Sequence, residues 1–144
     1  MELALIKELE LRKEEFEDEV VETIYFGGGT PSVLNTAEID QIIGAVYSNY
    51  TVVAEPEITL EANPDDLSKE KIEELGKSPI NRLSIGIQSF FEGDLKLMNR
   101  AHNAQEAEAC IALAQDYFDN ISIDLIYGIP GMTNERWISN IEKA

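Results

Sequence analysis

Cysteine and histidine are nearly absent from this sequence of 144 residues, which contains one of each, Cys110 and His102. A single cysteine excludes a disulfide within the chain, and it excludes a metal site built only from the cysteines of this chain. Cys110 lies in the middle of a helical pattern among alanines. We therefore expect it to be a small core residue rather than a nucleophile.

Basic residues are also scarce, with 11 Lys and Arg against 28 Asp and Glu and a formal net charge of −17. An acidic surface repels DNA and RNA unless its few cations are clustered, and both Arg82 and Arg100 are isolated in the sequence. The charge therefore argues against nucleic acid as a partner.

Long apolar runs are absent too, since none approaches the ~20 residues that a membrane-spanning helix needs. Residues 1–4 lack the basic start and apolar stretch of a signal peptide, so we expect a cytoplasmic protein without an integral membrane segment. Hydrophobic residues make up 44% of the chain, which is enough for a core, and the length is that of one domain or a piece of one.

What the sequence does contain is a glycine turn directly after a short apolar strand. Residues 23–26 (Thr-Ile-Tyr-Phe) lead into residues 27–31 (Gly-Gly-Gly-Thr-Pro). Glycines tolerate positive φ and let a ligand approach the main chain, and ligands bind at the carboxyl ends of parallel strands. The turn therefore predicts a polar or anionic group held by backbone N–H groups, with a plain tight turn as the alternative.

Strand and helix patterns alternate along the rest of the chain. Short apolar segments predict strands at residues 22–26, 58–62, 82–88 and 121–127. Five helical patterns lie before, between and after them, whereas residues 90–100 predict a looser connection. This alternation is typical of βαβ units and a parallel sheet, so the predicted fold class is α/β.

Capping residues mark where most of these helices begin. The first helix is expected over residues 2–19, and the others after the caps Asn35, Ser68, Asn103 and Thr133. The helix after Asn35 has an apolar stripe at helical spacing, whose two tyrosines we expect to pack in the core. The stripe consists of Ile39, Ile42, Ile43, Val46, Tyr47 and Tyr50.

The predicted strands alternate apolar and polar residues, unlike strands of a parallel sheet that is covered on both faces. The apolar face should be covered by the helices. The other face carries small polar groups, with Glu61, Gln88 and Asp124 near the carboxyl ends of three strands. A buried polar face is costly unless a ligand or water satisfies it, so we expect a site that suits an ammonium group and a ribose diol. An open sheet with a solvated face is the alternative.

Four motifs occur in order between residues 20 and 135. They are residues 27–31 (Gly-Gly-Gly-Thr-Pro), 61–64 (Glu-Ala-Asn-Pro), 82–90 (Arg-Leu-Ser-Ile-Gly-Ile-Gln-Ser-Phe) and 124–131 (Asp-Leu-Ile-Tyr-Gly-Ile-Pro-Gly). Together they resemble the oxygen-independent coproporphyrinogen III oxidases and their relatives in the radical S-adenosylmethionine (SAM) superfamily. Residues 98–103 (Met-Asn-Arg-Ala-His-Asn) look more similar to the heme-chaperone branch than to the oxidases.

The resemblance implies a partial (β/α)6 barrel, of which this chain would supply about four strands. Residues 1–144 would be an incomplete radical SAM core domain that runs from its first to its fifth helix. The resemblance also implies seven SAM contacts, each to one part of the molecule. These are Gly28, Gly29 and Thr30 with Glu61 for the methionyl amino group, Gln88 and Asp124 for the ribose hydroxyls, and Arg100 for the carboxylate.

One feature of the family is missing from the sequence. The family binds a [4Fe-4S] cluster through a CxxxCxxC loop, and the single Cys110 cannot replace three thiolates. We therefore expect a piece of a longer protein that is catalytically inert by itself. The parent would bind SAM and the cluster and handle a tetrapyrrole, either as a heme chaperone or as a true oxidase that decarboxylates coproporphyrinogen III.

Other polar residues have plainer interpretations. A lone His102 could ligate heme or donate a proton, but a capping or surface role is favoured. Tyr25 and Tyr127 at strand ends could face the interior or pack at the rim. The acidic run that follows the first helical turns is expected to be a solvated face, and it comprises Glu14, Glu15, Glu17 and Asp18.

An alternative of another class is a cluster-free module that binds nucleotide or phosphate at the glycine turn. Neither G-x-G-x-x-G nor a P-loop lysine is present to support it. Strands missing on both sides of the four present would also leave exposed sheet edges, which predicts self-association.

Overall fold

The apolar segments form one parallel sheet, as the sequence predicts. The computed structural model describes residues 2–16 and 18–144, so the predicted solvated position of Glu17 lies outside the described residues. The sheet has the strand order β1-β2-β3-β4, and all three strand pairs are parallel. The strands are β1 (Val20–Phe26), β2 (Thr51–Ala62), β3 (Arg82–Gln88) and β4 (Ile121–Leu125).

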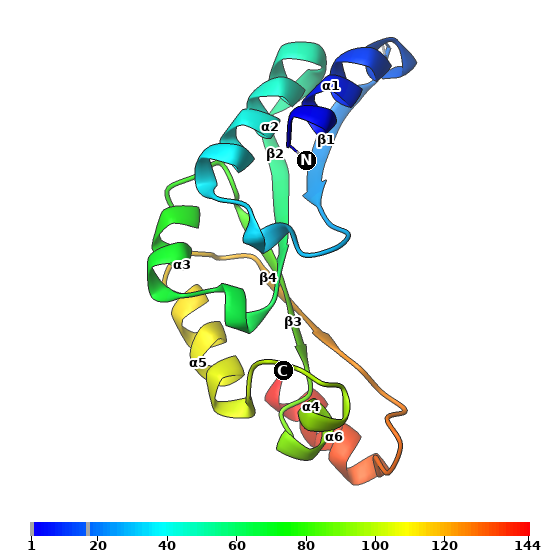
Figure 1. Ribbon diagram of the computed structural model, residues 1–144, viewed down its shortest axis with the longest axis vertical. Coiled ribbons are helices and arrows are strands. Elements are labelled where there is room, and N and C mark those ends of the chain that lie inside the picture. Colours follow the sequence, from blue (N-terminus) through cyan, green and yellow to red (C-terminus); the bar gives the residue numbers. More distant parts are fainter. Residues whose placement is uncertain (1, 17) are drawn as a thin grey trace.

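Helices connect the strands and lie mainly on one side of the sheet. Figure 1 shows α2, α3 and α5 along that side, α1 beside α2 and β1 at one end of the long axis, and α4 and α6 at the other end. The α-helices are α1 (Glu2–Arg12), α2 (Thr36–Asn49), α3 (Lys69–Leu75), α4 (Glu92–Leu97), α5 (Ala104–Ala114) and α6 (Asn134–Lys143). Short 3₁₀ helices are η1 (Lys13–Phe16), η2 (Pro31–Val33) and η3 (Pro64–Asp66).

The predicted capping boxes fix two helix starts. Asn35 Oδ1 accepts from the Glu38 N–H at 2.9 Å, and Glu38 Oε2 accepts from the Asn35 N–H at 2.8 Å. Asn103 and Glu106 repeat both bonds at 2.9 Å. These bonds satisfy N–H groups that have no partner within the helix, so α2 and α5 begin where the sequence predicts.

The core lies between the apolar face of the sheet and the helices. Side chains that point to this face from the two central strands are completely or almost completely buried, and so are the facing side chains of α2 and α3. Among them are Ile58, Leu60, Leu83, Ile85, Ile87, Ile39 and Ile72. The predicted division of the sheet into an apolar, helix-covered face and a polar face is therefore confirmed.

Five elements differ in extent from the prediction. Strand β1 begins at Val20 rather than at residue 22, and β4 ends at Leu125 rather than at residue 127. The helix expected over residues 2–19 ends at Arg12 and tightens into η1, as helix ends often do. Strand β2 begins at Thr51 rather than at residue 58. Residues 90–100 contain a short helix, α4, where a looser segment was expected.

The apolar stripe of α2 is narrower than predicted. Ile39, Ile42, Ile43 and Val46 are buried, whereas Tyr47 is 49% exposed, so its predicted core position is wrong. At about 100° per residue, Tyr47 lies about 80° around the helix from Ile39, at the edge of the stripe.

Candidate functional site

The glycine turn after β1 closes onto the end of β2. Gly28 and Gly29 have φ of 78° and 66°, a region that residues with a Cβ rarely adopt. The Gly28 N–H donates to Glu61 Oε2 at 3.2 Å, and the Tyr25 hydroxyl donates to Glu61 Oε1 at 2.8 Å. The turn therefore places its backbone beside a carboxylate of the chain itself, and the Gly28 N–H that was expected to face a ligand is bonded to Glu61.

Strand register aligns the polar residues of three strands. Glu61 of β2 lies opposite Ser84 of β3, and Ser84 lies opposite Ser122 of β4, whose hydroxyl donates to Ser84 Oγ at 3.1 Å. Next to this row lies a polar cavity of about 150 Å³. Its walls include five of the seven predicted SAM contacts, namely Gly29, Thr30, Glu61, Gln88 and Asp124.

The wall of the cavity also includes Asn63, which the sequence assigns to one of the four motifs but not to a ligand contact. Asn63 follows Glu61 by two residues, and in an extended chain this spacing places both side chains on the same face. The two-residue repeat of side-chain direction along a strand was therefore the signal that could have identified Asn63 as a wall residue.

Gln88 reaches the cavity through an unusual backbone conformation. Its φ is 68°, in the left-handed region, at the carboxyl end of β3. A Cβ on Gly86 would lie 2.7 Å from Gln88 Nε2, so glycine at 86 leaves the space that the amide occupies. The side chain of Gln88 therefore folds back over the polar face of its own strand.

A buried polar network holds the chain just beyond Gln88. Asn140 of α6 is completely buried, accepts from the Phe90 N–H at 2.8 Å and donates to Ser89 Oγ at 3.1 Å. Ser89 donates to Asp94 Oδ2 at 2.8 Å, and Arg136 pairs with Asp94 Oδ1 at 2.9 Å. Helices α4 and α6 are thus tied to the end of β3.

Arg100 lies behind the cavity rather than in its wall. Its Nη2 donates to Asn63 Oδ1 at 2.5 Å and to the Gly86 carbonyl at 3.4 Å. A guanidinium carries five N–H donors, so these two bonds from one nitrogen leave others for an anion. The structure thus brings Arg100 close to the site through Asn63.

The surface role favoured for His102 is wrong, because His102 is buried with only 3% exposure. Its Nε2 lies 3.1 Å from the Ile87 carbonyl, and its Nδ1 lies 3.3 Å from Asp65 Oδ1. The ring therefore connects the loop before α5 to β3 and η3. The helix cap is the next residue, Asn103.

The only cysteine, Cys110, is a buried residue of α5, as predicted. Burial disfavours the thiolate and raises the pKa of the Cys110 thiol to about 11. A thiol that stays protonated at neutral pH is a poor metal ligand and a poor nucleophile.

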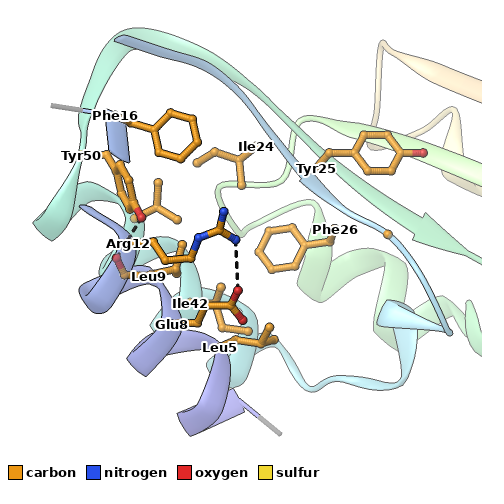
Figure 2. Close-up of a pocket in the computed structure, with 12 residues that line it drawn as sticks. Leu5, Glu8, Leu9, Arg12, Phe16, Ile24, Tyr25, Phe26, Ile42 and Tyr50 are labelled. Carbon is orange, nitrogen blue, oxygen red and sulfur yellow. Dashed lines mark hydrogen bonds and ion pairs between the residues drawn. The ribbon is translucent and has the colours of Figure 1, made fainter. Parts of the chain in front are cut away.

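A second cavity, of about 420 Å³, is mostly apolar and lies between α1, β1 and α2. In Figure 2 the side chains of Ile24 and Phe26 point towards it, whereas Tyr25 points away to the other face of β1. The guanidinium of Arg12 beside it pairs with Glu8 at 3.2 Å and Glu15 at 2.8 Å. The polar residues of the candidate site line the smaller cavity, on the other face of the sheet.

Comparison with known proteins establishes the family. The sequence matches the model of the radical SAM superfamily over residues 3–144. The chain belongs to the radical SAM superfamily. This confirms the superfamily that the four motifs indicate.

Its relatives within the radical SAM superfamily include heme chaperones. The chain is 41% identical to the heme chaperone HemW of Lactococcus lactis over 141 residues, which are 97% of this chain and 37% of that protein. It is 36% identical to the mitochondrial radical S-adenosyl methionine domain-containing protein 1 of Mus musculus, covering 85% of this chain and 28% of that protein. The chain thus spans roughly a third of the length of these relatives.

Solved structures share the fold, and one of them is a radical SAM enzyme. The coproporphyrinogen III oxidase HemN of Escherichia coli superposes with a TM-score of 0.84 at 31% identity, over 97% of this chain and 32% of that one. Elp3 of Methanocaldococcus infernus superposes with a TM-score of 0.77 at 20% identity, which shows the fold alone. The four parallel strands therefore correspond to part of a radical SAM (β/α) barrel.

Membership of this superfamily implies SAM and a [4Fe-4S] cluster as family cofactors, and the residues present fit them unequally. The polar cavity offers carboxylate acceptors together with amide and backbone groups that suit the polar groups of SAM. The cluster does not fit, because the single cysteine is buried and protonated. Within residues 2–16 and 18–144, no group of three or more His, Cys, Asp or Glu side chains is placed to hold a metal ion. No helix in the same ranges is long and apolar enough to cross a membrane.

Proposed function

We propose that this chain carries the SAM-binding part of a radical SAM protein, at the polar cavity where the glycine turn meets the ends of β2, β3 and β4. The observation that carries the proposal is the convergence of Glu61, Gln88 and Asp124 on one cavity beside a turn with positive φ. Carboxylate and amide groups bind a ribose diol and an ammonium group by hydrogen bonds and charge.

The residues divide the ligand between them. Acceptor oxygens of the Gly28 and Gly29 backbone and of Thr30, together with the Glu61 carboxylate, would hold the methionyl amino group, because an ammonium group only donates. Gln88 and Asp124 would bind the two ribose hydroxyls, because they face the same cavity from adjacent strands. Arg100 would bind the carboxylate with N–H groups other than those of Nη2.

For the whole protein we propose a role in heme or tetrapyrrole metabolism in the cytoplasm, as a heme chaperone. Support comes from the several relatives named heme chaperone HemW, such as those of Lactococcus lactis and Escherichia coli at 41% and 34% identity. A chaperone of this kind would bind heme and pass it to an acceptor protein. The buried His102 and Cys110 would have to leave their present positions to ligate heme.

An oxidase is the second candidate, and a specific observation favours it. The chain superposes on the coproporphyrinogen III oxidase of Escherichia coli over 97% of its length. Oxidative decarboxylation requires the radical chemistry that SAM and the cluster supply together, and this chain lacks the cluster cysteines. We therefore propose that the chain binds SAM without cleaving it.

A titration of the purified chain with SAM tests the proposal. Asp124→Asn should weaken SAM binding about fivefold or more, because a charged acceptor of a ribose hydroxyl is lost. Asp119→Asn is the matched control, since Asp119 is an exposed aspartate in the loop before β4. Equal affinity of the two variants would contradict the assigned site.

The same titration separates the alternative of another class. A cluster-free phosphate- or nucleotide-binding module would bind ATP or inorganic phosphate, and adding either of them would displace SAM from the chain. A SAM site of the proposed kind would not, because a chain of net charge −17 has little attraction for polyanions.

A further inference from the structure

Tyr25 lies on the polar face of β1, one strand away from Glu61. The strand register places Tyr25 opposite Thr59, two residues before Glu61. Figure 2 shows its ring on the opposite side of β1 from Ile24 and Phe26, which point to the apolar cavity. The alternation of the strand thus sends one aromatic side chain to the ligand face and its neighbours to the helix side.

The carboxylate of Glu61 is held by one donor on each oxygen. The Tyr25 hydroxyl donates to Oε1 at 2.8 Å, and the Gly28 N–H donates to Oε2 at 3.2 Å. Both donors come from β1 and its turn, so together they fix the plane of the carboxylate. An ionised carboxylate has about four acceptor positions, and two therefore remain for a ligand.

Gly27 makes room for this arrangement. A Cβ at residue 27 would lie 2.8 Å from Tyr25 Cε1 and 3.1 Å from Glu61 Cδ. Any larger residue would push the phenol ring or the carboxylate aside. The first glycine of the turn is thus explained by these two side chains, whereas Gly28 and Gly29 are explained by their positive φ.

The phenol acts as a donor at neutral pH. Its hydrogen bond to Glu61 raises the pKa of Tyr25 above the ordinary value, with smaller contributions from burial and from the charges of Glu61 and Asp124, which outweigh an opposing effect of Ser84. A neutral hydroxyl beside an ionised carboxylate has one favourable orientation, in which its O–H bond points at a carboxylate oxygen.

We propose that Tyr25 is a positioning residue of the ligand site, which orients the Glu61 carboxylate so that it accepts the amino group of the methionyl part of SAM. This inference rests on the proposed function. Tyr25 would then orient the Glu61 carboxylate, which a residue that only packs at the rim would not do.

The test compares Tyr25→Phe with the unmodified chain and with Tyr127→Phe. Tyr25 is 54% exposed and loses only its hydroxyl, so the fold should be unaffected. Tyr127 is the control, because it is also exposed and its ring packs on Trp137 rather than on a carboxylate. Two ligands are titrated, SAM and 5′-methylthioadenosine, which shares the adenosine part but lacks the amino acid.

Tyr25→Phe should bind SAM at least about tenfold more weakly, as expected for loss of one hydrogen bond to a charged group, and should bind 5′-methylthioadenosine as the unmodified chain does. Tyr127→Phe should bind both unchanged. A purely structural effect would weaken both ligands together. Equal SAM affinity of Tyr25→Phe and the unmodified chain would overturn the inference while the proposed function stands.

A second measurement keeps the inference testable apart from ligand binding. In an NMR titration of tyrosine ring carbons, Tyr25 should titrate above its ordinary range, and Glu61→Gln should lower its pKa. An ordinary Tyr25 pKa in the unmodified chain would overturn the inference, because the pair would not exist in solution. A chain that shows the pair but binds neither nucleoside would instead contradict the proposed function.

Discussion

The proposed ligand site depends on one residue whose backbone conformation is unfavourable for its type. Gln88 has φ of 68°, which costs a residue with a Cβ roughly 1–2 kcal/mol relative to the right-handed region. Such strain persists only where the surroundings enforce it, and it concentrates at functional sites. Here the enforcing groups are the buried bonds of Ser89 and Phe90 to α6.

Stability and binding should therefore change in opposite directions when Gln88 is replaced by glycine. Gln88→Gly removes the strain but adds unfolded-state entropy of about 0.5–1 kcal/mol, so the free energy of unfolding should stay equal or rise by up to about 1.5 kcal/mol. SAM binding should weaken, because the amide is lost. Gln88→Ala should weaken binding without the gain in stability. Urea denaturation measures the free energy of unfolding, and a SAM titration measures the affinity. A Gln88→Gly chain that is clearly less stable than the unmodified chain would contradict the inference that Gln88 is strained.

The placement of single residues around the cavity was predictable where chemistry and spacing agree. Glu61, Gln88 and Asp124 were identified because polar residues alternate with apolar ones near strand ends. His102 was not placed correctly, because its burial depends on the Ile87 carbonyl and Asp65, which are distant in the sequence. No local sequence pattern predicts a contact that joins three separate segments of the chain.

Among the secondary-structure elements, α6 is anchored by a polar residue rather than by its apolar ones. Ile138 and Ile141 are more than half exposed, whereas Asn140 is completely buried. The Asn140 side chain satisfies the Phe90 N–H and meets Ser89, and Arg136 of the same helix pairs with the buried Asp94. The attachment of this helix to β3 and α4 is therefore mainly a hydrogen-bond network.

Asn140→Ala should lower the free energy of unfolding by about 2–3 kcal/mol, because the buried Phe90 N–H and Ser89 hydroxyl lose partners. Asn134→Ala is the matched control, since Asn134 is exposed at the start of the same helix and should change stability by less than about 0.5 kcal/mol. Thermal or urea denaturation provides the comparison. Equal effects of the two substitutions would mean that the network does not hold the helix in solution.

Helix starts were predicted more reliably than strand lengths, and the reason is physical. A capping box consists of two bonds within four residues, so Asn35 and Asn103 predict the starts of α2 and α5 directly. The first half of β2 was missed because Pro56 lies inside it, and proline cannot donate to a ladder. The register of β1 and β2 shifts between Val21 and Thr23, so Pro56 lies where regular pairing is interrupted, and its carbonyl accepts from Asn81 instead.

At the scale of the whole molecule, the sheet has two outer strands. Among the described residues, β1 pairs only with β2 and β4 only with β3. Exposed apolar side chains lie near the β1 edge, including Val20 at 53% and Phe16 at 49% exposure. Unpaired strand edges are templates for pairing with another chain, whereas the net charge of −17 opposes the approach of a second copy.

Self-association of this chain should therefore increase with both concentration and salt. At about 0.1 M salt charges act over about 10 Å, whereas at about 1 M they act over only about 3 Å, so salt removes the repulsion and leaves edge pairing and apolar contact. Val20→Lys should reduce association, because a lysine on the edge disfavours pairing. Val33→Lys adds the same charge at another exposed valine, on η2, and serves as the control. Sedimentation velocity measures the association. A monomer at high protein and salt concentration would show that the β1 edge does not pair. Equal effects of the two lysine substitutions would show the same.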